Sequence, residues 1–287
     1  MTITRSVPGK INLFLEVLGK RPDGYHDLRT VFLPVEEPQD EVTVSLRAEA
    51  GLEVFCDQPG VPGGEENICG RAARAFATAA AREPRWRIAI AKRIPVAAGM
   101  GGGSADAAAT LLALNQLAGE PLDQPTLHQL AAKLGADVPF FLEPRPALGE
   151  GIGDRLRPLS LGCDLGLVLV NPGFPVPVAW SYANLNRVPR PPAPACAALL
   201  EALAAGDMDG IAAGVHNDLE YAVRDKFPLV EMLRARLLAA GCAAVAVSGS
   251  GPTLFGLTPG DPAPAAAAIR AEFVGEAWIQ PTWVRRH

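Results

Sequence analysis

The sequence has no stretch of 18 consecutive apolar residues, and Arg5, Lys10 and Glu16 interrupt its first twenty positions. A membrane-spanning helix needs about 20 mostly apolar residues, and a signal peptide needs an uninterrupted apolar segment. We therefore expect neither a membrane span nor a signal peptide. An excess of positive charge is also missing, because the formal net charge is −5. The composition thus offers no overall field for nucleic acid or anionic lipid.

Cysteine pairs at metal-binding spacing are absent as well. The five cysteines lie at positions 56, 69, 163, 196 and 242, with no C-x-x-C pair and no histidine at zinc-ligand spacing nearby. This pattern argues against a zinc site and against a disulfide framework. We expect reduced thiols and a cytoplasmic protein.

What the chain does contain is typical of a globular protein with two domains. It has 287 residues, of which 49% are hydrophobic and 20% charged, enough for a large core. Periodicity predicts strands at 8–18, 41–46, 87–96, 165–170, 243–248 and 253–257, and helices at 67–82, 107–118, 125–134, 196–205 and 228–240. We place the domain boundary near 151–153, which gives domains 1–152 and 153–287.

The first strand carries two polar side chains on one face. Apolar and polar residues alternate from 8 to 18, so Lys10 and Asn12 point the same way from a half-buried strand. The turn "RPDG" at 21–24 follows, with Pro setting φ and Gly accepting the left-handed conformation. This turn presents Tyr25 and His26 on an exposed segment.

A glycine-rich run, "PVAAGMGGGSADAAA" at 95–109, follows the strand at 87–96 and opens an amphipathic helix. It is not a dinucleotide fingerprint, because Ser104 occupies the third glycine position, and it is not a Walker loop, because the chain has no G-K-[ST]. Two interpretations remain: an anion-binding turn at a helix N-terminus, or an ordinary tight turn. In either case Ser104 is expected to cap the helix.

Asp137 stands where a helix that ends at Gly135 meets Pro139. A residue before proline is biased toward extended geometry, so we expect Val138 to be extended and Asp137 to lie at a helix-to-strand corner. A structural aspartate at a corner or cap is one interpretation, and a catalytic carboxylate is the other.

Several of these segments together resemble the GHMP kinases, a family named for galactokinase, homoserine kinase, mevalonate kinase and phosphomevalonate kinase. The glycine run resembles the central motif of the family, and "SGSGPTLFG" at 248–256 resembles its C-terminal motif. "PGKINLFLEVLGKRPDGYHDLRTVF" at 8–32, "GADVPFF" at 135–141 and "HNDLE" at 216–220 are similar to the branch of the family that acts on a cytidine diphosphate-linked methylerythritol.

The resemblance implies an α+β protein with the two-domain GHMP kinase fold. Its N-terminal α/β domain would bind nucleotide, its C-terminal domain would be ferredoxin-like, and the active site would lie in the cleft between them. The implied activity is transfer of phosphate from ATP, with Mg²⁺, to a hydroxyl of the cytidine diphosphate-linked substrate in the non-mevalonate route to isoprenoid precursors. The only expected partner is this small molecule, and both a monomer and a homodimer remain open.

The resemblance also assigns roles to residues. It implies Asp137 as the general base and Lys10 as its catalytic partner, where a solvated lysine is the other interpretation. The predicted ATP-binding residues are Asn67, Pro95, Val96, Ala97, Ala98, Gly99, Met100, Gly101, Gly102, Gly103, Ser104 and Ala105. Asn67 could equally be a helix cap, and Ser104 is the best candidate for a metal contact, through water.

Substrate contacts are implied for a second set of residues: Asn12, Tyr25, His26, Tyr182, Gly249, Ser250 and Gly251. Tyr25 and His26 would read the cytosine and Tyr182 would close its other side, although turn aromatics are often loop anchors. Val178 stands where some relatives carry a hydroxyl residue, which leaves open whether the substrate makes a hydrogen bond at this position. Gly249 and Gly251 would border the phosphate or acceptor, and a hairpin turn is compatible with that role.

Two other functions compete with this one. A homoserine- or mevalonate-type kinase would share the glycine run but has no need of the "RPDGYH" segment. A non-catalytic nucleotide-binding module would not need both Lys10 and Asp137.

Overall fold

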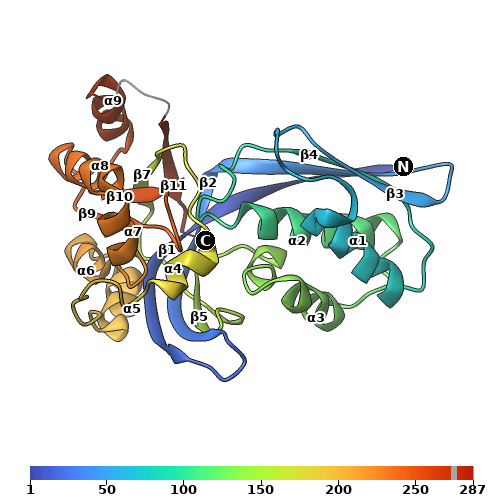
Figure 1. Cartoon of the computed structure of the whole chain (residues 1–287), viewed down its shortest axis with the longest axis horizontal. Helices are drawn as coiled ribbons and strands as arrows, with labels where there is room; N and C mark the ends of the chain where they lie inside the picture. Colours follow the sequence, from blue (N-terminus) through green and yellow to red (C-terminus); the bar gives the residue numbers. More distant parts are fainter. Residues whose placement is uncertain (273–276, 287) are drawn as a thin grey trace. The chain divides into compact units, whose positions relative to one another are not determined.

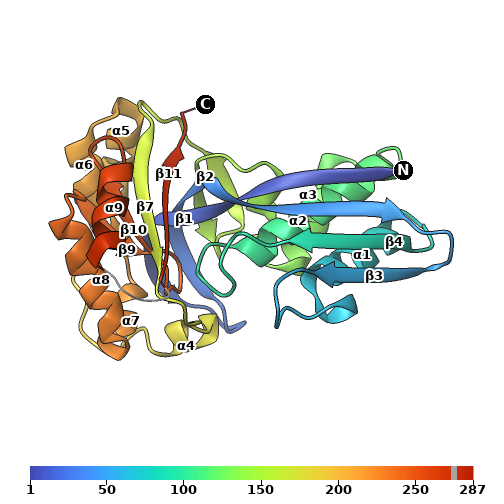
Figure 2. The same ribbon diagram turned by 90° about the horizontal axis from the view of Figure 1, so that it is seen from above.

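The computed structural model describes residues 1–272 and 277–286 (Figures 1 and 2). It divides into two compact units, each assembled from separate parts of the chain. Unit 1 contains Met1–Gly9, Gln39–Ile94 and Gly101–Pro144. Unit 2 contains Lys10–Pro38, Pro95–Met100 and the described residues from Arg145 onward. The predicted domain boundary at 152/153 cuts the sequence once, whereas each unit combines separate segments. The boundary therefore stays a prediction.

Unit 1 contains a sheet with the order β3-β4-β2-β1. The strands are β1 (Thr2–Lys20), β2 (His26–Leu46), β3 (Gly51–Cys56) and β4 (Arg85–Ala91), and unit 1 holds the parts of β1 and β2 that lie in its own segments. β2 runs antiparallel to β4, and β3 runs parallel to β4. Val42, Val44 and Ile88 are fully buried, as the alternation in both strands predicts.

The predicted strand at 87–96 is too long, because β4 ends at Ala91. Beyond Ala91, the main-chain N–H groups donate to carboxylates and are therefore not available to a neighbouring strand. Asp57 accepts the N–H of Lys92 at 2.8 Å, and one oxygen of Asp40 accepts the N–H groups of Arg93 at 2.6 Å and Ile94 at 2.9 Å. The strand therefore does not run directly into the glycines.

The helices of unit 1 are α1 (Ile68–Ala79), α2 (Gly102–Leu117) and α3 (Gln124–Leu134), with short 3₁₀ turns η1 (Gly64–Glu66) and η2 (Pro139–Leu142). They lie together on one face of the strands (Figure 1). The three predicted helices are thus confirmed. The expected amphipathic character of α2 is wrong, because all its residues from Ala105 to Leu111 are buried. Its small side chains allow neighbours to pack closely on every side.

Unit 2 contains the remaining parts of β1 and β2, with β5 (Ala147–Gly151), β6 (Arg155–Pro158) and β8 (His216–Asn217). β5 runs antiparallel to β2 and to β6, and β8 runs parallel to β1. β1 forms as predicted, but the expectation of a half-buried strand is wrong. Every residue from Gly9 to Leu15 is buried, so Lys10 and Asn12 need polar partners inside the protein.

A second sheet of unit 2 has the order β11-β7-β10-β9, with every neighbouring pair antiparallel. Its strands are β7 (Leu165–Asn171), β9 (Ala244–Val247), β10 (Leu254–Thr258) and β11 (Trp278–Val284). The helices are α4 (Val178–Ala183), α5 (Cys196–Ala205), α6 (Met208–Gly214), α7 (Glu220–Lys226), α8 (Pro228–Ala239) and α9 (Ala263–Glu272). Since helices separate β7 from β9 and α9 separates β10 from β11, this is a ferredoxin-like β-α-β-β-α-β arrangement.

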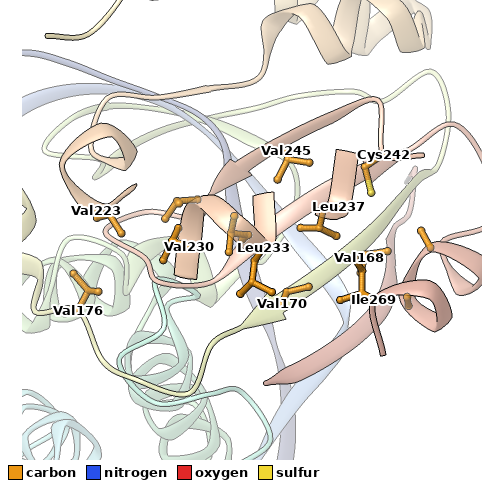
Figure 3. Packing of buried hydrophobic residues seen from close by; sticks show 14 residues of the cluster. Val168, Val170, Val176, Val223, Val230, Leu233, Leu237, Cys242, Val245 and Ile269 are labelled. Atoms are coloured by element: carbon orange, nitrogen blue, oxygen red, sulfur yellow. The ribbon is translucent and has the colours of Figure 1, made fainter. Parts of the chain in front are cut away.

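Aliphatic side chains fill the space between this second sheet and its helices (Figure 3). Val168 and Val170 come from β7, Leu233 and Leu237 from α8, and Ile269 from α9; all five are at most 2% exposed. Burial of this apolar surface holds the helices on the sheet. The predicted strands at 165–170, 243–248 and 253–257 and the helices at 196–205 and 228–240 are confirmed within a residue or two.

Two adjacent leucines of α8 provide a matched test of this core. Leu237 is 0% exposed and Leu238 is 39% exposed. We expect Leu237→Ala to lower the free energy of unfolding by about 2–5 kcal/mol, because it leaves a cavity. Leu238→Ala should change it by about 0.5 kcal/mol or less. Urea unfolding of both variants measures the difference, and equal losses would contradict the packing described here.

Candidate functional site

The glycine-rich run contains two left-handed glycines, Gly99 (φ 77°) and Gly101 (φ 73°). In unit 2, a Cβ on Gly99 would lie 2.0 Å from the carbonyl oxygen of Ser248. Both the φ value and this close approach require glycine at position 99. The run from 92 to 101 contains no helix or strand, and the close approach fixes its path.

In unit 1, α2 begins directly after Gly101, which is its N-cap. No side chain caps this end, and Ser104 is the third residue of the helix, so the predicted Ser104 cap is wrong. The left-handed conformation of Gly101 sets the start of the helix ahead of the serine. Because the first N–H groups of a helix have no partners within it, this end is chemically suited to an anion.

Beside this helix end lies a buried ionic cluster that the sequence analysis missed: Asp40, Lys92 and Asp106. Lys92 Nζ pairs with Asp40 Oδ2 and lies 2.8 Å from Asp106 Oδ2 in the first turns of α2. The other Asp106 oxygen, Oδ1, is buried and makes no hydrogen bond within the described part of the chain. The sequence feature that could have indicated this cluster is Asp106, an aspartate in an alanine-rich helix.

Burial controls the charge of this cluster. It is the largest cause of the raised pKa of Asp106, about 7, with the Asp40 carboxylate adding to the rise and Lys92 opposing it. For Lys92, burial lowers the pKa, but the two carboxylates outweigh it, so that the pKa is raised overall. The ammonium therefore stays charged next to the start of α2.

In unit 2, Lys10 is 4% exposed, and its ammonium is hydrogen-bonded within this unit. Its Nζ donates to Asn12 Oδ1 at 2.6 Å and to the carbonyl oxygen of Gly99 at 3.1 Å. Asn12 Nδ2 in turn donates to Thr30 Oγ1 at 2.8 Å. The predicted shared direction of Lys10 and Asn12 on β1 is thus confirmed.

The turn after β9 lies against this pair. Ser248 Oγ donates to the Gly99 carbonyl at 3.0 Å and accepts the N–H of Asn12 at 3.4 Å. A Cβ on Gly249 would lie 3.4 Å from Lys10 Nζ. The structure therefore brings together four of the predicted site residues: Lys10, Asn12, Gly99 and Gly249. Ser248 lies among them.

The rest of this turn is also tightly built. Gly251 has φ 81° and donates its N–H to the Ser248 carbonyl at 2.9 Å. The carbonyl of Ser250 accepts a hydrogen bond from Ser181 Oγ at 3.1 Å. These contacts are those of a structural turn, and a ligand role for Ser250 and Gly251 stays a prediction.

The aromatic candidates also meet in unit 2. The "RPDG" turn forms as predicted, and Tyr25 after it is 59% exposed. The rings of His26 and Tyr182 are stacked, with centroids 4.9 Å apart and planes 22° apart. Val178, the first residue of α4, is 59% exposed. His26 and Tyr182, both half-buried and more than 150 positions apart, thus form one aromatic patch, and Tyr25 directly precedes His26 in the chain.

Asp137 belongs to unit 1 and lies half-buried in a turn between α3 and η2. The expected helix-to-strand corner is wrong, because Val138 has helical φ and ψ of −62° and −40°. Hydrogen bonds from the Val138 N–H to Gly135 and from the Phe141 N–H to Val138 stabilise this turn against the preference of a pre-proline residue.

Asn67, the other unit 1 candidate, caps α1. Its Oδ1 accepts the N–H of Cys69 at 2.9 Å, and its Nδ2 donates to the carbonyl of Pro62 at 2.8 Å. The cap interpretation is therefore confirmed, and a contact with nucleotide stays a prediction.

Two kinds of feature are absent from residues 1–272 and 277–286. No group of three or more His, Cys, Asp or Glu side chains in these ranges is placed to hold a metal ion. None of the helices described there combines the length and apolar character that crossing a membrane requires.

Comparison with known proteins gives matches across both halves of the chain. Residues 67–143 match the model of the GHMP kinases N terminal domain, and residues 199–275 match that of the GHMP kinases C terminal domain. A 4-diphosphocytidyl-2-C-methyl-D-erythritol kinase of Geobacter sp. (strain M21) is 44% identical over 265 residues, which are 92% of this chain and 92% of the relative.

Solved structures agree with these matches. A crystal structure of 4-(cytidine 5'-diphospho)-2C-methyl-D-erythritol kinase superposes with a TM-score of 0.80 at 40% identity, covering 98% of this chain and 99% of the other. Homoserine kinase from Cytophaga hutchinsonii also gives a TM-score of 0.80, at 19% identity over 100% of this chain and 96% of its own, and so shares the fold. Taken with the glycine-rich turn, the buried Lys10 and the ferredoxin-like sheet, these matches show that the chain belongs to the GHMP kinases.

Proposed function

We propose that this GHMP kinase transfers the γ-phosphoryl group of ATP to a hydroxyl of 4-diphosphocytidyl-2-C-methyl-D-erythritol, a step of the non-mevalonate route to isoprenoid precursors. The observation that carries the choice of acceptor is the His26–Tyr182 stack beside the exposed Tyr25. Aromatic faces suit a flat base, whereas homoserine and mevalonate have none. The 44% identity to a kinase of that name supports the same choice.

The reaction forms a bond between the acceptor oxygen and the γ-phosphorus and breaks the bond from that phosphorus to the β–γ bridging oxygen, releasing ADP. We propose that the Asp137 carboxylate takes the proton of the acceptor hydroxyl as the new bond forms. Lys10 is proposed to stabilise the negative charge that develops on the transferred group. Its hydrogen bonds to Asn12 and Gly99 hold the ammonium in one place before substrate arrives.

ATP is proposed to bind with its phosphates at the start of α2, where N–H groups of the first turn are not capped by a side chain. Mg²⁺ would reduce the repulsion between phosphate oxygens. Ser104, in this first turn, is the residue proposed to reach the metal through water. Such a Mg²⁺ site does not require a cluster of protein carboxylates, because Mg²⁺ commonly keeps several water and phosphate ligands.

A cytoplasmic location fits an enzyme that consumes ATP, and all five cysteines are free thiols in the structure. Reduced thiols are the norm in that compartment. We therefore keep the cytoplasm as the proposed location, with a small molecule as the proposed partner. A monomer and a homodimer both remain compatible with this function.

Replacement of the proposed base gives the first test. Asp137→Asn should lower kcat by about 10²- to 10⁴-fold and leave ATP binding nearly intact, because the amide cannot accept the proton. Asp123→Asn is a matched control in the same unit, since Asp123 caps α3 by accepting the N–H of Thr126, and it should keep normal kcat. Near-normal turnover of Asp137→Asn would remove Asp137 from the mechanism.

Lys10 is tested in the same assay. Lys10→Met should lower kcat comparably, and the double variant Lys10→Met/Asp137→Asn should be far less impaired than the product of the two single effects if the residues act as a unit.

A substitution at Gly103 is expected to change ATP affinity and the stability of the fold in opposite directions. Gly103 is exposed in the first turn of α2, and the nearest atom to an added Cβ is Ile68 Cγ2 at 3.9 Å. Gly103→Ala should therefore stabilise the fold by about 0.5–1 kcal/mol yet weaken ATP binding by about tenfold, because the methyl group would occupy space that phosphate oxygens need. Thermal unfolding and calorimetric titration measure the two effects. Unchanged ATP affinity would favour an ordinary turn.

The acceptor site is tested at the aromatic patch. Tyr25→Ala and His26→Ala should raise KM for the cytidylated acceptor, since stacking on an aromatic ring contributes about 1–3 kcal/mol per base, and should leave KM for ATP almost unchanged. Phe55→Ala is a matched control, because Phe55 is also 59% exposed and lies on β3. Equal KM values for all three variants would contradict the proposed cytosine site.

A further inference from the structure

The segment His216–Glu220 has no role in the function proposed so far, although it is almost completely buried in unit 2. On one side it is fixed to β1. β8 pairs with this strand in parallel, with Phe14 opposite His216 and Leu15 opposite Asn217. Asp218 extends the pairing, because its N–H donates to the Leu15 carbonyl at 2.9 Å and its Oδ2 accepts the N–H of Val17 at 2.7 Å.

On its other side the same segment holds the end of β9. Asn217 is 1% exposed, and its Nδ2 donates to the carbonyls of Val247 at 2.6 Å and Gly249 at 2.7 Å. Its Oδ1 accepts the N–H of Leu219 at 2.9 Å. Both N–H groups of the Asn217 side chain thus donate to the main-chain carbonyls of the residues on either side of Ser248.

Glu220 binds the other main-chain polar group of Val247, its N–H. Its Oε2 accepts the Val247 N–H at 3.0 Å, so both main-chain groups of Val247 are bound by the 216–220 segment. Burial raises the pKa of Glu220, while the Val247 N–H and Arg224 oppose the rise. Val223, one turn further along α7 and labelled in Figure 3, belongs to the same apolar cluster as Val247.

The residues held in this way are those that touch the Lys10–Asn12 pair. Ser248 binds the Gly99 carbonyl, to which Lys10 also donates. A Cβ on Gly249 would lie 3.2 Å from Asn12 Oδ1 and 3.4 Å from Lys10 Nζ, so the main chain at 249 forms one wall around the ammonium. A shift of this turn would therefore move the groups that set the position of Lys10.

We propose that Asn217, supported by Glu220, is a positioning residue for phosphoryl transfer: it fixes the 247–249 main chain against Lys10 and Asn12. This inference rests on the role proposed for Lys10. Asparagine suits the position because its side chain supplies two N–H donors and a carbonyl acceptor at once. Since misplacement of a reacting group by about 1 Å can cost about 10²-fold in rate, loss of these bonds affects turnover more than binding.

The test is Asn217→Asp, which keeps the size of the side chain and removes both donors. We expect kcat to fall by about 10- to 100-fold, with KM for ATP changed by less than about twofold, because the phosphates of ATP are proposed to bind at the start of α2. Asn217→Ser keeps one donor and adds no charge, so it should lose less; it also covers the case in which Asn217→Asp does not fold. Glu220→Gln keeps an acceptor for the Val247 N–H and should retain most of the wild-type kcat.

Asn115→Asp is the matched control. Asn115 is 7% exposed in unit 1, and its side chain bonds both main-chain groups of Leu122, at 3.0 and 3.1 Å. This variant should lose stability, as Asn217→Asp does, and keep its kcat. If Asn217→Asp and Asn217→Ser lose no more kcat than the control, the positioning role is wrong.

Amide hydrogen exchange makes the outcome independent of turnover. Asn217→Asp should speed exchange at Gly251 and Thr253, whose N–H groups donate to Ser248 and Ala98, while Asn115→Asp should speed exchange only around 115–122. Unchanged exchange in the 248–253 turn would overturn the inference, even if the wild-type enzyme proved inactive on the cytidylated acceptor. Inactivity of the wild type would instead contradict the proposed function.

Discussion

The carbonyl oxygen of Gly99 is the point on which the candidate site of unit 2 depends. It accepts hydrogen bonds from Lys10 Nζ and Ser248 Oγ, and the main chain at Ser248 comes so near that no residue with a side chain fits at 99. A buried ammonium is costly unless its donors are satisfied. Gly99 therefore does two things: it lets two turns meet, and its carbonyl oxygen supplies a hydrogen-bond acceptor that holds the buried Lys10 Nζ in place.

Unit 1 solves a related electrostatic problem at the start of α2. A helix N-terminus is positive, and Lys92 Nζ lies 3.0 Å from the position that a Cβ on Gly102 would take. Asp40 and Asp106 offset this concentration of positive charge. Asp40 also binds the N–H groups of Arg93 and Ile94, so the cluster shapes the segment that leads toward the glycines.

Local patterns in the sequence predicted much of this arrangement. Alternation placed Lys10 and Asn12 on one face of a strand, the "RPDG" turn presented Tyr25, and glycines marked helix ends. Patterns could not show partners far apart in the sequence: Lys92 is 52 residues from Asp40, and His26 stacks on Tyr182, more than 150 residues away.

Errors arose where a specific contact outweighed a general preference. Ser104 is a good cap by type, but the left-handed Gly101 starts the helix earlier. Val138 precedes proline, yet main-chain hydrogen bonds stabilise its helical turn. The polar residues of β1 suggested a solvent-exposed face, whereas their hydrogen bonds to each other and to Gly99 allow both faces to be buried.

The acceptor that we propose for this kinase is a cytidine-linked alcohol. The most direct test of this proposal is ADP release by the wild-type enzyme with ATP and, in parallel, the cytidylated methylerythritol, the uncytidylated methylerythritol phosphate, homoserine and mevalonate. A site that stacks and hydrogen-bonds the base leaves those groups unpaired when the base is missing. We therefore expect kcat/KM for the cytidylated compound to exceed that for each other acceptor by about 10⁴-fold or more. Equal efficiency with homoserine, mevalonate or the uncytidylated phosphate would contradict the proposal.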